Sequence, residues 1–154
     1  MTIILDAHLL LLLIVGTTSR DYITAHRRLR EYTDADFLLL TQMLTAASKI
    51  VVTPNTLTEA SNLAGYIAEP ARTRIYQTFR AIVAADGTEE RYTESKVAVT
   101  RTEFERIGLT DSCLLQIATA PHMLLTSDLQ LYLAALNQGL QVENFNHLRS
   151  HLGA

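Results

Sequence analysis

Short apolar, β-branched runs alternate with helix-like segments along this chain of 154 residues. The strand-like runs cover residues 3–5, 50–53, 122–125 and 140–142, and a further short strand is expected near Tyr92. This alternation favours parallel pairing, because a helical crossover returns the chain to the same end of the sheet. The sequence therefore predicts an α/β fold, a three-layer α/β/α sandwich with a mostly parallel central sheet.

Capping and stop signals set the expected helix boundaries. Thr53 followed by Pro54 is typical of a helix start, and Thr110 is expected to cap a later helix. Gly16 is expected to end the first helix, because glycine commonly follows a helix C-terminus. The predicted helices cover residues 9–16, 21–31, 34–48 and 145–151, and others begin near residues 54, 70, 95, 110 and 129.

Composition limits the number of domains and the compartment. With 48% hydrophobic residues and no Gly-, Pro- or Ser-rich linker, the chain is expected to form a single domain over residues 1–154. Its single cysteine, Cys113, cannot form an internal disulfide, which favours a reducing compartment. The apolar run at residues 9–15 is too short to span a bilayer. We therefore expect a cytoplasmic protein that does not associate with a membrane.

The charge of the chain is slightly acidic, but its cations are unevenly distributed. A net charge of −3 argues against a protein that holds nucleic acid through a uniformly basic surface. All basic residues except Lys49 and Lys96 are arginines, which are the better bidentate partners for phosphate. They include two groups, Arg27, Arg28 and Arg30, and Arg72, Arg74 and Arg80. For each group alone, a solvated helix face is the simpler interpretation.

Four acids fall where a strand-like run meets a helix-like run: Asp6, Glu59, Asp111 and Asp128. An acid near a helix start needs no catalytic explanation, since the helix dipole stabilises it by roughly 0.3–1 kcal/mol. Helices that follow parallel strands, however, begin at the carboxyl edge of the sheet, where ligands bind. Four carboxylates gathered there would repel one another unless they shared protons or bound cations. Mg²⁺ or Mn²⁺ would supply the positive charge.

Such a site would hydrolyse phosphodiesters with two metal ions and a metal-activated water, without a nucleophilic side chain. The sequence fits that chemistry, because it has no GxSxG elbow, no GxxxxGK[ST] loop, no HExxH and no paired cysteines. Two other carboxylate-rich folds fit less well. A haloacid-dehalogenase-like phosphatase needs an aspartate where His8 stands, and neither lysine suits a response-regulator receiver.

Four segments resemble the PIN-domain family, and the resemblance extends over nearly the whole chain. They read ILDAHLLL, VVTPNTLTEASNLA, GLTDSCLLQIA and LLTSDLQLYLAALNQGLQVENFNHL. The pattern resembles the family's three nearly invariant acids and its frequent fourth. The resemblance therefore implies that Asp6, Glu59, Asp111 and Asp128 are the catalytic, metal-binding acids. Family members are typically Mg²⁺- or Mn²⁺-dependent ribonucleases.

Three further residues are candidates for supporting roles. Thr126 resembles the family's hydroxyl residue two places before the last acid, and Asn144 follows the final strand, where a polar neighbour of the site is common. His8 is a candidate contact for a phosphate or a metal-bound water, although a lone histidine is more often structural. The first motif departs from the family, because Ala7 and His8 replace a small hydroxyl residue and an Asn or Ser. The chain is also longer than the most compact toxin-type members of the family, chiefly through residues 17–37, which carry Arg27, Arg28 and Arg30.

Three functions are compatible with this pattern. The leading hypothesis is a divalent-metal-dependent endoribonuclease acting on RNA, and the resemblance adds a candidate role, because many ribonucleases of this family are toxins of toxin–antitoxin pairs. Such toxins are usually homodimers that a small antitoxin protein neutralises. The alternative, motivated by the altered first motif and the acidic net charge, is a PIN-fold RNA- or protein-interaction module with weak or no turnover. A DNA nuclease ranks third, because two-metal hydrolysis barely senses the sugar 2′-hydroxyl.

Overall fold

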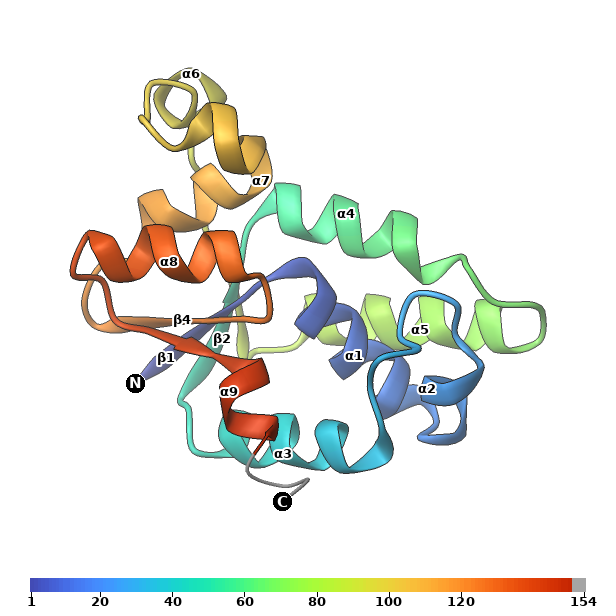
Figure 1. The fold of residues 1–154 in the computed structure, drawn as a ribbon. Helices are drawn as coiled ribbons and strands as arrows, with labels where there is room; N and C mark the ends of the chain where they lie inside the picture. Colours follow the sequence, from blue (N-terminus) through green and yellow to red (C-terminus); the bar gives the residue numbers. More distant parts are fainter. Residues whose placement is uncertain (151–154) are drawn as a thin grey trace.

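The computed structural model describes residues 1–150, which form a five-stranded sheet with helices on both faces (Figure 1). Every pair of neighbouring strands is parallel, in the order β3-β2-β1-β4-β5. This confirms the predicted α/β sandwich, and the sheet is wholly parallel over the described residues. The strands are β1 (Thr2–Leu5), β2 (Lys49–Val52), β3 (Thr88–Glu90), β4 (His122–Thr126) and β5 (Val142–Asn144).

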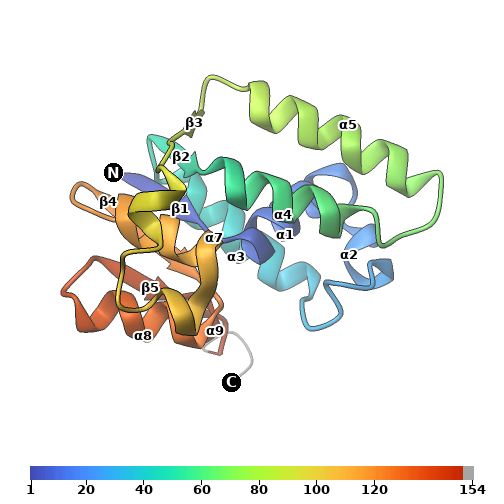
Figure 2. The ribbon, with the colours of Figure 1, turned by 90° about the horizontal axis from the view of Figure 1, so that it is seen from above.

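The central strand β1 supplies both faces of the sheet with core residues. Successive side chains of a strand point to opposite faces, so Ile3 and Leu5 enter one apolar cluster while Ile4 enters the other. The first cluster is covered by α1 (Ala7–Thr18), α3 (Asp34–Thr45), α4 (Pro54–Ala64) and α5 (Ala71–Ala84). The second is covered by α7 (Phe104–Ile117) and α8 (Leu129–Asn137). Figure 2 shows these two helical layers on either side of the sheet.

Short helices complete the described chain and correct some predicted boundaries. These are α2 (Asp21–Ala25), α6 (Ser95–Ala98) and α9 (Phe145–Arg149). The expected strand near Tyr92 is β3, which ends before it, and β5 begins at Val142, where the predicted strand ended. Helix α3 ends at Thr45 rather than residue 48, and the predicted end of the last helix, His151, lies outside the described residues. None of the helices in residues 1–150 is long and apolar enough to cross a membrane.

Gly16 does not end the first helix, as the sequence predicted, but lies inside α1. A Cβ atom built on it would lie 2.2 Å from Cδ2 of the buried Phe37 ring. The glycine is therefore required for the close approach of α1 and α3, which local sequence signals do not reveal.

Gly16→Ala is expected to lower the free energy of unfolding by about 1–3 kcal/mol, because the added methyl group overpacks the contact with Phe37. The matched control is Gly87→Ala, since a Cβ atom there meets nothing within 4 Å. Urea denaturation of the three proteins measures the difference. Equal destabilisation by both substitutions would contradict this role of Gly16.

Helix α2 is much shorter than the predicted helix over residues 21–31. His26 leaves the helix with extended backbone angles, and its ring Nε2 lies 3.2 Å from the carbonyl oxygen of Ala64 in α4. Its Nδ1 accepts a hydrogen bond from the backbone N–H of Arg28. Burial lowers the pKa of His26, which favours the neutral ring that this pair of contacts requires. A tertiary contact thus ends α2.

Helix α7 contains a break that repositions a predicted helix start. Gly108 has φ 81° and ψ −177°, a conformation that side-chain-bearing residues rarely adopt. The helical segment with Asp111 therefore begins directly after Gly108, and Thr110, predicted as its cap, lies within α7.

Candidate active site

Asp6 lies at the carboxyl end of the central strand and caps α1. Its Oδ1 accepts a hydrogen bond from the N–H of Leu9 at 2.9 Å. Its Oδ2 accepts from the Thr126 hydroxyl at 2.5 Å and from the N–H of Ser127 at 2.9 Å. Three donors from two elements therefore hold one carboxylate that is only 5% exposed.

The environment of Asp6 acts on its protonation in two directions. Burial raises the pKa of Asp6, because removal from water disfavours the charged form. The hydrogen bonds from Thr126, Leu9 and Ser127, and the charge of His8, offset part of that rise. Asp6 is thus a buried carboxylate whose orientation is fixed before any ligand arrives.

Thr126 connects Asp6 with Asp128. The Thr126 side chain is buried at the end of β4, and its hydroxyl donates to Asp6 while accepting from the N–H of Asp128 at 3.0 Å. Asp128 caps α8, with Oδ1 accepting from the N–H of Leu131 at 2.9 Å, and its side chain is exposed. One hydroxyl group therefore contacts both the Asp6 carboxylate and the backbone of Asp128, and it fixes their relative position.

On the hypothesis of a metal-dependent ribonuclease, Thr126→Val is expected to reduce RNA cleavage roughly 10- to 100-fold, the usual cost of losing a group that orients a metal ligand. Valine keeps the shape of threonine but leaves Asp6 without one of its three donors. Initial rates at several Mn²⁺ concentrations provide the measurement, with Thr78→Val, an exchange on α5, as the control. A Thr126→Val rate within twofold of wild type at all concentrations would exclude this role.

The charges of the other three acids act on the pKa of Asp111. Its pKa rises to about 7, first because it is buried and then because of the negative charges of Asp128, Asp6 and Glu59. Like charges raise the pKa of a carboxyl group by disfavouring its ionised form. The charges of all three other predicted acids therefore reach Asp111, although the chain separates them widely.

The carboxylate oxygens nevertheless do not converge on one point. Within residues 1–150, no group of three or more His, Cys, Asp or Glu side chains stands close enough to hold a metal ion. Asp6 and Asp128 turn oxygens toward the backbone N–H groups that they cap. The donor chemistry suits a hard cation such as Mg²⁺ or Mn²⁺, but coordination would require side-chain rotation at the exposed acids.

An open pocket of about 420 Å³ adjoins Glu59 and bridges α4 and α7. Glu59 is half-buried on α4, about one and a half helical turns after the N-cap Thr53. The pocket lining is mostly amide and hydroxyl groups: Pro54, Asn55, Thr58, Glu59, Asn62 and Thr110. Side chains of this kind can bind the polar edges and sugar hydroxyls of a nucleotide.

The other two predicted supporting residues have different surroundings. Asn144 pairs in register with Thr126 across β4 and β5, is 3% exposed and caps α9 through a hydrogen bond from the N–H of Asn146. It therefore stabilises the strand end beside the site. His8 is exposed on the first turn of α1, and among the described residues its side chain makes no hydrogen bond to an acid.

Tyr32 is a neighbour of the site that the sequence did not indicate. It comes from the loop before α3, is 2% exposed, and its hydroxyl makes no hydrogen bond of ordinary geometry within residues 1–150. Burial raises the pKa of the Tyr32 hydroxyl, the Ser127 side chain lowers it, and the negative charge of Asp6 raises it. Its ring packs against Phe145, with the Arg149 guanidinium 4.8 Å from the ring centroid. No local pattern predicts this position.

A salt bridge ties the C-terminal helix to the first turn of α3, which directly follows the loop that carries Tyr32. Arg149 in α9 donates two hydrogen bonds to the buried Asp36 carboxylate, at 3.1 and 2.6 Å. Asp36 in turn accepts from the backbone N–H of Thr33 in a capping box at the start of α3. The segment over residues 17–37 is therefore anchored beside the site.

Comparison with known proteins adds no family assignment. No protein-family model matches the chain, and a search of curated proteins found no match either.

Proposed function

We propose that this protein is a divalent-metal-dependent endoribonuclease of the PIN type. The observation that supports it most is the raised pKa of Asp111, which senses Asp6, Glu59 and Asp128 at the carboxyl edge of a parallel sheet. A carboxyl group on which three other carboxylates act, at the position where α/β sheets bind ligands, favours a cationic ligand. Helix capping does not explain the presence of all four acids, because Glu59 and Asp111 cap no helix.

Each acid would contribute in a different way. When bound, Mg²⁺ or Mn²⁺ would polarise the phosphodiester and lower the pKa of an attacking water. Asp6 presents a carboxylate already oriented by three donors, so little reorganisation is needed there. Asp128 and Glu59 are more exposed and can rotate toward a cation. Asp111, whose pKa is raised to about 7 first by burial and then by the charges of the other acids, would give up its proton once a cation neutralised those charges.

The pocket between α4 and α7 would hold the nucleotide next to the scissile bond. Asn55, Thr58 and Asn62 offer donors and acceptors on the same side of α4 as Glu59. Positioning of the substrate beside oriented carboxylates is itself a large part of hydrolytic catalysis.

The direct test is cleavage of a single-stranded RNA by the purified chain with Mn²⁺, with Mg²⁺ and with excess chelator. Cleavage that requires the metal and returns when metal is restored is expected. Absence of cleavage under every metal condition, or cleavage undiminished in chelator, would refute the proposal.

A second candidate is an interaction module of the same fold with weak or no turnover. It is favoured by one observation, that the acidic oxygens of the described residues do not converge. Titration calorimetry with Mn²⁺ separates the two candidates, because the enzyme should bind metal tightly at a fixed stoichiometry and the module should not. Tight binding that is lost in an Asp111→Asn variant would exclude the module.

The resemblance to the PIN-domain family also points to a cellular role for the proposed nuclease. We propose a cytoplasmic toxin that acts as a homodimer and is neutralised by a small antitoxin protein. Light scattering measures the dimer, and growth arrest on expression of the chain, relieved by a product of the neighbouring gene, tests the pairing. A monomeric chain whose expression leaves growth unchanged would contradict both parts.

A further inference from the structure

The loop after α2 is docked onto the C-terminal end of α4. The His26 ring contacts the Ala64 carbonyl, and the backbone N–H of Arg27 donates to the Tyr66 carbonyl at 3.3 Å. Figure 1 shows this loop, in blue, rising beside the far ends of α4 and α5. Two arginine groups that the chain separates, Arg27, Arg28 and Arg30, and Arg72 and Arg74, are thereby brought to one corner of the molecule. We refer to these five residues together with Tyr66 as the arginine corner.

Aromatic rings, rather than carboxylates, hold several of these arginines. The Arg28 guanidinium lies 4.4 Å from the centroid of the Tyr66 ring, which is 41% exposed. Arg72 lies 4.9 Å from the centroid of the Tyr76 ring, and Arg74 donates to the Tyr22 hydroxyl at 3.0 Å. Guanidinium groups positioned in this way keep N–H donors available for a phosphate.

The charge at the arginine corner is not neutralised by salt bridges. Within residues 1–150, none of its five arginines has a carboxylate oxygen within 4.0 Å, whereas Arg20, Arg91, Arg101 and Arg149 each form a salt bridge. The nearest acid in sequence to Arg72, Glu69, directs both carboxylate oxygens at Thr73, at 2.7 and 2.6 Å. A chain with a net charge of −3 thus retains a local cluster of unpaired cations.

The polar face of α4 connects the arginine corner to the acids. Asn55, Glu59 and Asn62 recur at helical spacing on α4 and line the pocket between α4 and α7, and Tyr66 follows two residues after the helix ends at Ala64. Residues three or four apart lie on the same side of a helix. From Glu59 to Ala64, the last residue of α4, the rise along the helix is about 8 Å, so one strand of nucleic acid can contact both Glu59 and Tyr66, which follows the helix end.

We propose that the arginine corner binds single-stranded RNA, with the arginines contacting phosphates and Tyr66 offering a ring face to a base. The strand then follows α4 toward the acids. The cleavage of that strand rests on the proposed function, but the binding does not. Phosphate contacts from arginine and base stacking on an exposed aromatic ring are the two interactions that single-stranded nucleic acid binding combines. An uncharged or double-stranded ligand would use only one of them.

Fluorescence anisotropy with a labelled 12-nucleotide RNA tests this surface in excess chelator, where metal-dependent cleavage cannot occur. The Arg27→Glu/Arg28→Glu variant is expected to raise the Kd at least about tenfold and to flatten its salt dependence, since each lost phosphate contact lowers the slope by about 0.7. Tyr66→Ala is expected to raise the Kd about fivefold or more by loss of stacking. Thermal unfolding confirms that each variant is folded.

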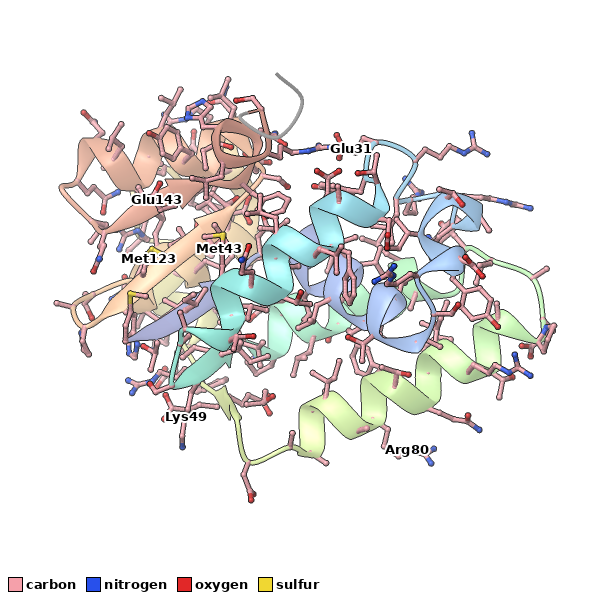
Figure 3. The ribbon with its side chains drawn as sticks, turned by 90° about the horizontal axis from the view of Figure 1, so that it is seen from below. Glu31, Met43, Lys49, Arg80, Met123 and Glu143 are labelled. Atoms are coloured by element: carbon pink, nitrogen blue, oxygen red, sulfur yellow. The ribbon has the colours of Figure 1, made fainter. Side chains whose placement is uncertain are left out.

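Arg80→Glu is the matched control, because Arg80 is exposed on α5 and points outward, away from the loop after α2 (Figure 3). Its Kd is expected to stay within twofold of the wild-type value. Undetectable RNA binding by the wild-type chain, equal weakening by the control, or wild-type affinity in the corner variants would overturn the proposal. If binding follows the expected pattern while no RNA is cleaved with any metal, the nuclease proposal fails and the arginine corner stands.

Discussion

Asp6→Asn is expected to reduce metal-dependent RNA cleavage by about a thousandfold or more, a loss of about 4 kcal/mol in transition-state stabilisation. Asp6 is the one acid whose oxygens are oriented by donors from both α1 and the β4 end. Asparagine is nearly isosteric and is an accepted helix cap, but it removes the negative charge that a cation needs. The rate loss should therefore exceed any loss of structure.

The stability of this variant must be measured together with its rate. Both Asp6 oxygens accept hydrogen bonds, so the asparagine NH₂ group must face at least one N–H or O–H donor. That mismatch costs about 1–3 kcal/mol, while loss of a buried charge returns part of it. Circular dichroism at the assay temperature establishes whether the variant is folded.

Asp86→Asn is the control for the Asp6 variant, because Asp86 is an exposed acid in the turn before β3. Its cleavage rate is expected to equal that of the wild-type chain. A folded Asp6→Asn protein that retains more than a tenth of the wild-type rate would show that Asp6 does not serve the reaction.

The metal-free protein is expected to lose stability as the pH rises through 7, and Asp111 is the cause. Its pKa is about 7 in the folded chain, against a reference value of 3.8. Between these two values the folded state binds the proton and the unfolded state does not. Protonation of Asp111 therefore stabilises the fold fully below about pH 4, and this contribution disappears above pH 7.

The size of the effect follows from 1.36 kcal/mol for each pKa unit. Between pH 5 and pH 8 the contribution of Asp111 should fall by about 2–3 kcal/mol, less whatever solvent screening removes at this partly exposed side chain. Urea denaturation in chelator at several pH values measures it. The difference between wild type and Asp111→Asn isolates this group, because every other titration is shared by both proteins.

Metal addition should reverse this dependence. Mn²⁺ bound by the four acids would hold Asp111 ionised, so binding should release a proton near pH 6 and strengthen as the pH rises. If the wild-type and Asp111→Asn curves run parallel from pH 5 to pH 8, the electrostatic neighbourhood of the four acids does not exist in solution.

Much of the fold was readable from local patterns. The strands at β1, β2 and β4 are short apolar runs, and Thr53 followed by Pro54 starts α4 as predicted. These features depend on contacts between residues near in sequence and on continuous burial, which periodicity records. The carboxyl ends of parallel strands meet at one edge of the sheet, so the edge that carries Asp6 and Asp128 was also predictable.

The surroundings of the site depend on contacts between distant residues. His26 ends α2 because Ala64 offers a carbonyl oxygen, and Arg149 holds the Tyr32 loop because Asp36 lies opposite it. No window of sequence contains both members of either pair. The role of Gly16 was not predictable for the same reason, because its neighbour Phe37 belongs to another helix.

By itself, then, the sequence determined the parallel α/β architecture and the edge of the sheet at which the four acids are found. Only the tertiary structure decided that Asp6 is oriented by Thr126 and Ser127 and that two remote arginine groups meet beside Tyr66. The physical reason is the range of the interactions. Periodicity and capping act within a few residues, whereas hydrogen bonds, ring contacts and charge repulsion act across space wherever packing brings the groups together.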